Sequence, residues 1–320
     1  MVEAKESVPM AVGQDGGVSM TGPLPRVAVL LAAYNGMNYI AEQIQSILAQ
    51  VDVDVTIFVS VDRSTDGTEK WVEALVRTKK NVILLPYGQH FGGAAPNFFH
   101  LFREVDFSSF DYVSLADQDD IWSEKKLFRA HEVMSKNRYD AYSSNVLAFW
   151  PSGRELLIDK AQPQVSHDYL FEAAGPGCTY VFAVASAINM KQFMLHRWEE
   201  VNGVGLHDWF FYAWYRANGL LWFIDDEWHM RYRQHGVNQV GANQGFSAIR
   251  SRFRLLRSGW YGTEVARIAV LVSSPSDRIA RLAMAKSWWV HLGLLLYIGS
   301  LRRRMRDRVV LMAIIIFGVF

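Results

Sequence analysis

Three aspartates stand close together in the segment Ala116–Trp122, which reads A-D-Q-D-D-I-W. An apolar run precedes them and predicts a short buried strand. Because open α/β sheets bind ligands at the carboxyl ends of their strands, we expect Asp117, Asp119 and Asp120 to lie at a ligand site. Carboxylates in this spacing can bind a hard divalent cation, which can neutralise a nucleotide diphosphate. The alternative is an acidic loop that caps a helix beginning near Ser123.

Strands and helices are predicted to alternate upstream of this motif. Apolar runs at Arg26–Ala33, Val53–Val61 and Asn81–Leu85 are typical of buried strands, and helical patterns occupy 40–48 and 69–76 between them. Such alternation implies parallel βαβ units whose strand-end loops gather along one edge of one sheet. The predicted fold class is α/β, with a Rossmann-like, mostly parallel sheet flanked by helices.

Distant loops should therefore converge at one edge of the sheet. Tyr34, Asp62 and Asp117 each follow a predicted strand, so they should meet although they are far apart in the sequence. The segment Ser64–Thr68 can cap the helix that follows it. The loop Gly88–Asn97 contains glycines, which either allow a ligand to approach the backbone closely or make a plain flexible turn. A further helix is expected to begin at the end of this loop.

A fourth aspartate, Asp208, lies at the start of a predicted aromatic helix whose first residues are H-D-W-F-F-Y-A-W. The helix dipole favours the charged form of a carboxylate in the first turn, and an ionised carboxylate is the form that a general base requires. Aspartate is also a favoured cap residue, so an N-cap is the competing interpretation. The residues alone leave both interpretations open.

Five motifs occur in a fixed order along the chain: A-A-Y-N-G (32–36), V-S-V-D-R-S-T-D-G-T (59–68), A-D-Q-D-D-I-W (116–122), H-D-W (207–209) and Y-R-Q-H-G-V-N-Q-V-G-A (232–242). In this order they resemble the family-2 glycosyltransferases with the GT-A fold, from about Val27 to Ala242. The D-Q-D-D-I-W and R-Q-H-G blocks look most like the rhamnosyltransferase branch, which builds bacterial O-antigen and other surface polysaccharides. One departure is Val61, which stands before Asp62 where the family usually has a second acidic residue.

This resemblance implies sugar transfer from a nucleotide-diphosphate donor and assigns tasks to several residues. It makes Asp208 the general base, with His207 as a neighbouring or acceptor contact. It makes Asp119 a ligand of Mg²⁺ or Mn²⁺, while Asp120 could cap the next helix. His235 could complete the metal shell or be structural. The implied donor-binding residues are Ala33, Tyr34, Asp62, Asn97, Asp117 and Arg233, and Arg231 and Arg233 are candidate phosphate clamps.

Composition excludes some classes of protein. Half of the 320 residues are hydrophobic and the formal charge is +1, which argues against a nucleic-acid partner. The single cysteine, Cys178, excludes an internal disulfide and fits a reducing cytoplasm. The expected organisation is a disordered leader at 1–23, a GT-A domain at 24–245 and a helical, membrane-associated region at 246–320.

Two apolar runs near the C-terminus, Trp288–Ile298 and Val309–Phe320, flank the arginine-rich stretch 302–308. Neither run has the roughly 20 residues that span a bilayer. We therefore expect an interfacial helix, with Trp288, Trp289 and residues 294–296 in the headgroup boundary and the arginines on anionic lipid. The alternatives are a helix that docks on the core and a homodimer interface. Removal of residues 286–320 is expected to spare donor binding.

The predicted activity is that of a non-processive, inverting glycosyltransferase on the cytoplasmic face of the bacterial inner membrane. A processive synthase is disfavoured because the nearest match to its Q-x-x-R-W motif, Gln192–Trp198, has the wrong spacing and precedes Asp208. L-rhamnose is the sugar that the branch suggests, and an undecaprenyl-diphosphate-linked saccharide is the acceptor that a membrane-facing C-terminus suits. The alternatives are a nucleotidyltransferase and a catalytically silent, membrane-bound nucleotide-sugar-binding protein.

Overall fold

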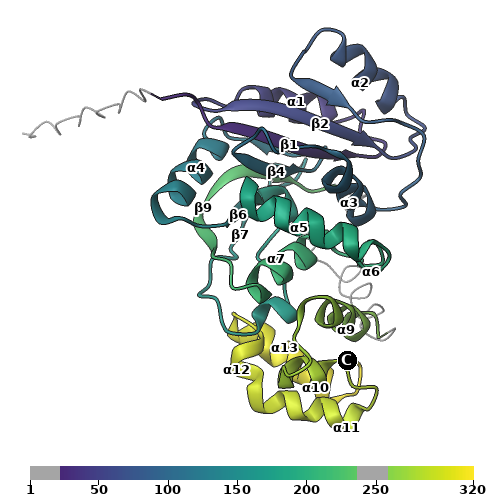
Figure 1. Ribbon diagram of the computed structural model, residues 1–320, viewed down its shortest axis with the longest axis vertical. Coiled ribbons are helices and arrows are strands. Elements are labelled where there is room, and N and C mark those ends of the chain that lie inside the picture. The colour runs from purple at the N-terminus through teal and green to yellow at the C-terminus, as the bar shows by residue number, and fades with distance from the viewer. Residues whose placement is uncertain (1–21, 236–258) are drawn as a thin grey trace, which may run out of the picture.

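One sheet of nine strands forms the centre of the described part of the chain, residues 22–235 and 259–320 of a computed structural model (Figure 1). Most of the expected leader, the end of the last motif (236–242) and an arginine-rich segment at 250–257 lie outside the described residues. The strand order is β3-β2-β1-β4-β8-β6-β9-β5, and β7 pairs with β6. The strands are β1 (Arg26–Ala33), β2 (Asp54–Val61), β3 (Val82–Leu84), β4 (Tyr112–Ala116), β5 (Ile121–Trp122), β6 (Ala141–Phe149), β7 (Glu155–Ile158), β8 (Val181–Ala183) and β9 (Trp222–Arg233).

Helices connect these strands and cover both faces of the sheet (Figure 1). The helices within the sheet region are α1 (Ile40–Leu48), α2 (Thr68–Val76), α3 (Ala94–Glu104), α4 (Lys126–Asn137), α5 (Val184–His196), α6 (Trp198–Asn202) and α7 (His207–Ala217), with 3-10 turns η1 (Asp168–Leu170) and η2 (Gly177–Thr179). The C-terminal helices are α9 (Trp260–Val272), α10 (Arg278–Ala283), α11 (Trp288–His291), η3 (Leu292–Tyr297), α12 (Ile298–Leu301) and α13 (Met305–Ile316).

The period-two pattern of β1 divides the core into two layers. Val27, Val29 and Leu31 belong to one buried cluster with residues of α1, α2 and α4, whereas Ala28 and Leu30 belong to a second cluster with residues of α3, α5 and α7. A strand buried on both faces reads as a continuous apolar run, because successive side chains point to opposite faces. The run Arg26–Ala33 is therefore a strand over its whole expected length.

Parallel pairing places the strand ends at one level. β1 pairs in parallel with β2, with Ala33 opposite Val61, and with β4, with Leu31 opposite Ala116. The residues that follow these strands, including Tyr34, Asp62 and Asp117, therefore lie along one edge of the sheet. The expected convergence and the α/β fold class are confirmed. Antiparallel strands such as β8 extend the sheet beyond this parallel half.

Local structure after the acidic motif differs from the expectation. Residues Ile121–Trp122 form β5, which pairs with β9, and the next helix begins at Lys126 rather than near Ser123. The residue before this helix is Lys125, and its first turn has no acidic residue. The interpretation of the aspartates as helix caps is therefore wrong. Their position depends on a strand pairing with distant residues, which the local sequence does not encode.

The C-terminal helices share one core with the sheet region. The Tyr261 ring of α9 stacks on Trp209 of α7 with 5.7 Å between ring centroids, and the buried cluster on this face continues through Leu294, Leu301 and Leu311. Helices α10–α13 lie at the end of the molecule opposite α1 and α2 (Figure 1). None of the described helices is both long enough and apolar enough to cross a bilayer.

Three details of the expected interfacial helix are wrong. The region is a series of short helices, and Leu294 is buried in it rather than exposed. Arg302 contacts Glu172 and Tyr261, Arg303 is buried, and Arg304 pairs with Asp159, so these three arginines dock on the core instead of facing outward.

Candidate active site

The Gln118 side chain holds the loop after β1 against the acidic motif. Its Oε1 accepts a hydrogen bond from the Tyr34 backbone N–H at 2.8 Å, and its Nε2 donates to the Tyr34 carbonyl at 2.8 Å. A Cβ at Gly36 would lie 2.4 Å from Gln118 Oε1, so only glycine fits there without a shift. Gln118 was not singled out from the sequence, although an amide between acidic residues is a signal for such a role.

Asp62 organises the loop after β3. Its buried carboxylate accepts hydrogen bonds from the backbone N–H groups of Phe91 (2.9 Å) and Gly92 (2.9 Å) and contacts His90 Nδ1 at 3.1 Å. Asn97 is buried in the first turn of α3, which begins at Ala94, and its Nδ2 donates to the Ala33 carbonyl at 3.4 Å. The expectation that this helix begins after Asn97 is wrong by about one turn. The donor-binding roles of these residues stay predictions.

The segment Ser64–Thr68 mainly ties two loops together. Ser64 Oγ and Thr68 Oγ1 accept hydrogen bonds from the backbone N–H groups of Asn35 (3.0 Å) and Gly36 (2.8 Å). The N-cap residue of α2 is Gly67, which has no side chain, and the predicted capping comes from Asp66, whose Oδ1 accepts the N–H of Thr68, the first residue of the helix, at 3.1 Å. The motif thus fixes the loop after β1 from one side, while Gln118 fixes it from the other.

Asp119 and His235 meet although 116 positions separate them: Asp119 Oδ2 lies 2.6 Å from His235 Nε2. The His235 ring also stacks on Tyr39, with 5.0 Å between centroids. An imidazole nitrogen and a carboxylate oxygen at this distance can bind one divalent cation. The two residues that the sequence predicted as metal ligands are therefore neighbours.

Asp117 and Asp120 point towards Cys178, and one ligand atom from each of the three lies within 4.8 Å of the others. Burial and the neighbouring Asp119 raise the pKa of Asp117 to about 7, while burial raises the pKa of Asp120 and of the Cys178 thiol. A neutral thiol is a poor ligand for Mg²⁺ or Mn²⁺. Asp120 accepts a hydrogen bond from a β9 backbone N–H rather than capping a helix.

Arg233 links the acidic motif to α1. Its Nε donates to the Asp119 carbonyl at 2.8 Å, its Nη2 pairs with Glu42, and its guanidinium lies 4.8 Å from the Tyr39 ring centroid. Arg231 pairs instead with Glu155 at 2.6 Å on the β7 side. Arg233 thus supports the acidic loop after β4 directly, and its role as a phosphate ligand stays a prediction.

Asp208 occupies the second position of α7 and does not cap it. The N-cap position belongs to Leu206, no side chain of the described residues caps this helix, and Asp208 Oδ1 accepts the adjacent N–H of Trp209 at 2.7 Å. The N-cap interpretation is therefore wrong. An N-cap carboxylate would accept the N–H groups of the second or third helical residue, whereas the second oxygen of this carboxylate is left for another partner.

Burial sets the electrostatics of this helix start. Burial raises the pKa of Asp208 to about 6, against the lowering effects of the Trp209 N–H and of Lys160. Burial thus outweighs the lowering of the Asp208 pKa that was expected from the helix dipole. A pKa of about 6 still leaves the carboxylate mostly ionised at neutral pH. Burial also lowers the pKa of His207 to about 3, so its imidazole is neutral. It stacks on Phe98 with 4.1 Å between centroids.

Gly177 fits against this pair because it has no side chain. A Cβ at this position would lie 2.5 Å from His207 Nε2 and 3.3 Å from Asp208 Cβ. The segment that contains Gly177 therefore packs directly against the start of α7. Because Cys178 follows in the same segment, it brings Asp208 and the acidic motif to one place.

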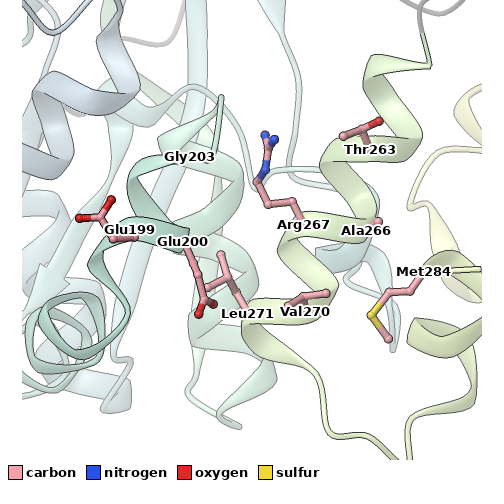
Figure 2. A pocket seen from close by; sticks show the side chains of 9 residues that line it. All are labelled: Glu199, Glu200, Gly203, Thr263, Ala266, Arg267, Val270, Leu271 and Met284. Carbon is pink, nitrogen blue, oxygen red and sulfur yellow. The ribbon is translucent and has the colours of Figure 1, made fainter.

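A separate pocket of about 470 Å³ lies between α6 and α9, away from these residues (Figure 2). Arg267 projects into the space between the two helices, with Glu200 on the opposite side (Figure 2). None of the predicted site residues lines this pocket, whose lining consists of Glu199, Glu200, Gly203, Thr263, Ala266, Arg267, Val270, Leu271 and Met284.

The parallel sheet edge, the aspartates after β4 and a carboxylate on α7 together define a GT-A glycosyltransferase. The chain belongs to glycosyl transferase family 2, whose model matches residues 28–190. It is 41% identical to the dTDP-rhamnosyl transferase RfbG of Shigella flexneri over 291 residues, which cover 91% of this chain and 100% of that protein. The predicted family, fold and transferase class are confirmed, and the nucleotidyltransferase and silent binding-protein alternatives are set aside.

Solved structures agree on the fold. TarS 1–349 of S. aureus, in complex with UDP-GlcNAc, has a TM-score of 0.55 at 14% identity and covers 85% of this chain and 75% of that chain. The mannosyltransferase PcManGT of Pyrobaculum calidifontis, in complex with GDP-Man and Mn²⁺, has a TM-score of 0.50 at 17% identity and covers 92% of this chain and 86% of that chain.

Proposed function

We propose that this glycosyltransferase moves L-rhamnose from dTDP-L-rhamnose to a saccharide acceptor with inversion, one sugar per acceptor, in surface-polysaccharide synthesis. The position of Asp208 carries the mechanism: its carboxylate does not cap α7, and Gly177 and Cys178 connect it to the acidic motif. Asp208 would take the proton of an acceptor hydroxyl, whose oxygen attacks the anomeric carbon as the nucleoside diphosphate leaves. Similarity to a dTDP-rhamnosyl transferase over its full length supports the sugar.

A donor screen tests the sugar and the nucleotide. Purified protein is incubated with Mn²⁺ and dTDP-, UDP- or GDP-sugars, and the release of nucleoside diphosphate is measured. We expect dTDP-L-rhamnose to be consumed in preference to the others. Exclusive use of a UDP- or GDP-sugar would contradict the proposed donor while leaving the family unchanged.

Asp119 and His235, with Asp117 nearby, would hold Mg²⁺ or Mn²⁺. The donor set fits a hard cation, since a carboxylate oxygen and an imidazole nitrogen already lie 2.6 Å apart and Asp117 is near enough for the charge of Asp119 to raise its pKa. When bound, the cation supplies positive charge against the leaving diphosphate. The carboxylates and the imidazole themselves fix where that diphosphate lies.

We expect Asp119→Ala to remove the Mn²⁺-dependent part of dTDP affinity, because one carboxylate ligand is lost. Calorimetric titration of dTDP with Mn²⁺ and with EDTA measures this part directly. Glu155→Ala is a matched control, since it removes an acidic residue of β7 that pairs with Arg231 and not with the acidic motif. If the parent protein binds dTDP with the same affinity in Mn²⁺ and in EDTA, the proposed metal site is contradicted.

We also propose that helices α11–α13 bind the cytoplasmic face of the bacterial inner membrane peripherally. Large apolar side chains are exposed there, with Trp289 70%, Leu296 81% and Phe317 79% accessible. Exposed cations on the same helical region, among them Lys286 and Arg306, suit anionic headgroups. A membrane position would bring the site close to an undecaprenyl-diphosphate-linked saccharide.

Replacement of Trp289, Leu296 and Phe317 together by serine is expected to release the protein from phosphatidylglycerol vesicles, because the apolar area that enters the headgroup boundary is lost. Co-sedimentation measures binding, and Leu221→Ser, an exposed leucine at 54% before β9, is the control. Unchanged sedimentation of the triple variant would contradict the membrane contact. A fall in oligomer size without any vesicle binding by the parent would assign these side chains to a homodimer instead.

A further inference from the structure

Lys160 carries an ammonium group without a counter-ion in the described structure. Its backbone N–H donates to Asn145 Oδ1 at 2.6 Å, which fixes the main chain beside β6. Within residues 22–235 and 259–320, its ammonium has no hydrogen bond and no carboxylate at ion-pair distance. Burial lowers its pKa, the charge of Glu172 raises it, and the charges of Arg303 and Arg302 lower it again. Because this half-buried ammonium pairs with no carboxylate among the described residues, an anionic ligand would stabilise its charge.

The segment Gly175–Cys178 shows on which side of the site this cation lies. A Cβ at Gly175 would lie 3.5 Å from Lys160 Cγ, and one at Gly177 would lie 3.3 Å from Asp208 Cβ. Cys178 then contacts the Asp117 cluster. The segment thus contacts Lys160 first, Asp208 next and the aspartates last, so Asp208 lies between Lys160 and the aspartates. Because the donor diphosphate belongs with the aspartates, Lys160 lies on the acceptor side of the base.

The C-terminal helices approach the same place. Arg304 pairs with Asp159, the neighbour of Lys160, at 3.0 Å, and Arg303 Nη2 donates to the Ala173 carbonyl at 2.7 Å, two residues before Gly175. These arginines have carboxylate partners of their own, whereas Lys160 has none among the described residues. Positive charge is thus in excess between Asp208 and the helices proposed to meet the membrane.

We propose that Lys160 binds a phosphate group of the acceptor, on the side of Asp208 away from Asp119. This inference rests on the proposed function, since it assumes an acceptor whose saccharide is linked through a diphosphate to a lipid. An ammonium suits a phosphate as a compact charge with three donors. Phosphate held at Lys160 would direct the saccharide towards Asp208 and the lipid towards α11–α13.

Binding of farnesyl diphosphate, a short prenyl diphosphate, tests the site without any transfer reaction. The full chain is titrated in EDTA, so that no divalent cation draws the probe to the aspartates. We expect Lys160→Met to weaken binding about tenfold or more, because one charge-assisted contact is lost, and Lys160→Arg to retain it. Farnesol, which lacks the diphosphate, should bind all three proteins equally. Thermal melting confirms that each variant is folded.

Wild-type affinity of Lys160→Met for farnesyl diphosphate would overturn the inference, and so would an equal loss of farnesol binding or a wild-type protein that ignores the diphosphate. Transfer assays separate this inference from the proposed function. If dTDP-L-rhamnose is consumed but Lys160→Met loses transfer equally to a diphosphate-linked and a neutral alkyl-linked saccharide, the acceptor role of Lys160 is wrong. If binding depends on Lys160 while no nucleotide sugar is turned over, the phosphate site stands and the proposed function fails.

Discussion

Asp208→Asn is expected to lower the rate of sugar transfer by about a hundredfold or more while dTDP binding persists. The amide keeps the shape of the side chain and can still accept the Trp209 N–H, but it cannot take a proton from the acceptor. Single-turnover kinetics with saturating donor measure the chemical step apart from binding. Turnover near that of the parent would remove Asp208 from the role of base.

Stability provides the control for this variant. Burial raises the folded-state pKa of Asp208 to about 6 from an ordinary value of 3.8. A raised carboxyl pKa means that the ionised form is less stable in the folded protein than in the unfolded chain, so the carboxylate destabilises the fold at neutral pH. The asparagine variant should therefore melt at the same temperature as the parent or higher. A lower melting temperature would indicate a structural role.

The pH dependence follows from the same group. The base must be ionised, so kcat/KM for transfer should be constant above about pH 7 and fall about tenfold per pH unit as pH drops below about 6. The decline has this sign because protonation removes the active form. The residual rate of Asp208→Asn should not show this decline at low pH. A decline that persists in this variant would mean that another group titrates.

Arg303→Met is expected to reduce the free energy of unfolding by about 3–5 kcal/mol, because it leaves buried carboxylates with too little positive charge. Arg303 lies 3.5 Å from both Asp168 and Glu172, and all three side chains are buried. Arg303 also donates to the Ala173 carbonyl, next to the segment that packs on Asp208. Urea unfolding monitored by tryptophan fluorescence measures the loss.

Arg306→Met is the matched control, because the Arg306 side chain is 76% exposed and pairs only with its neighbour Asp307 among the described residues. Its effect should stay within about 0.5 kcal/mol. Arg216 also pairs with Asp168, at 3.1 Å, and Arg302 pairs with Glu172, at 3.7 Å. A loss below about 1 kcal/mol for Arg303→Met would show that these two arginines suffice for the carboxylates. The burial of Arg303 and Leu301 in the shared core argues against the prediction that removal of residues 286–320 spares donor binding.

Much of the donor side could be predicted from the sequence. The strand Arg26–Ala33 and the level ends of β1, β2 and β4 follow from period-two burial and from βαβ connectivity, both of which are legible in the chain. The pairing of Asp119 with His235 needed the family resemblance, because 116 positions separate the two residues and no local pattern connects them. The helix predicted near Ser123 failed because β5 pairs with the distant β9.

The sequence by itself determined the elements, the residue types at the sheet edge and the family, because hydrophobic periodicity and motif spacing are properties of neighbouring residues. Only the tertiary structure decided that Arg303 enters the core, that Asp208 is not a cap and that Lys160 lacks a counter-ion among the described residues. A run of arginines or a single lysine has the same appearance in sequence whether it meets lipid, solvent or a buried carboxylate. Its partner is fixed by packing between segments far apart in the chain, which sets the burial and the charge around each group.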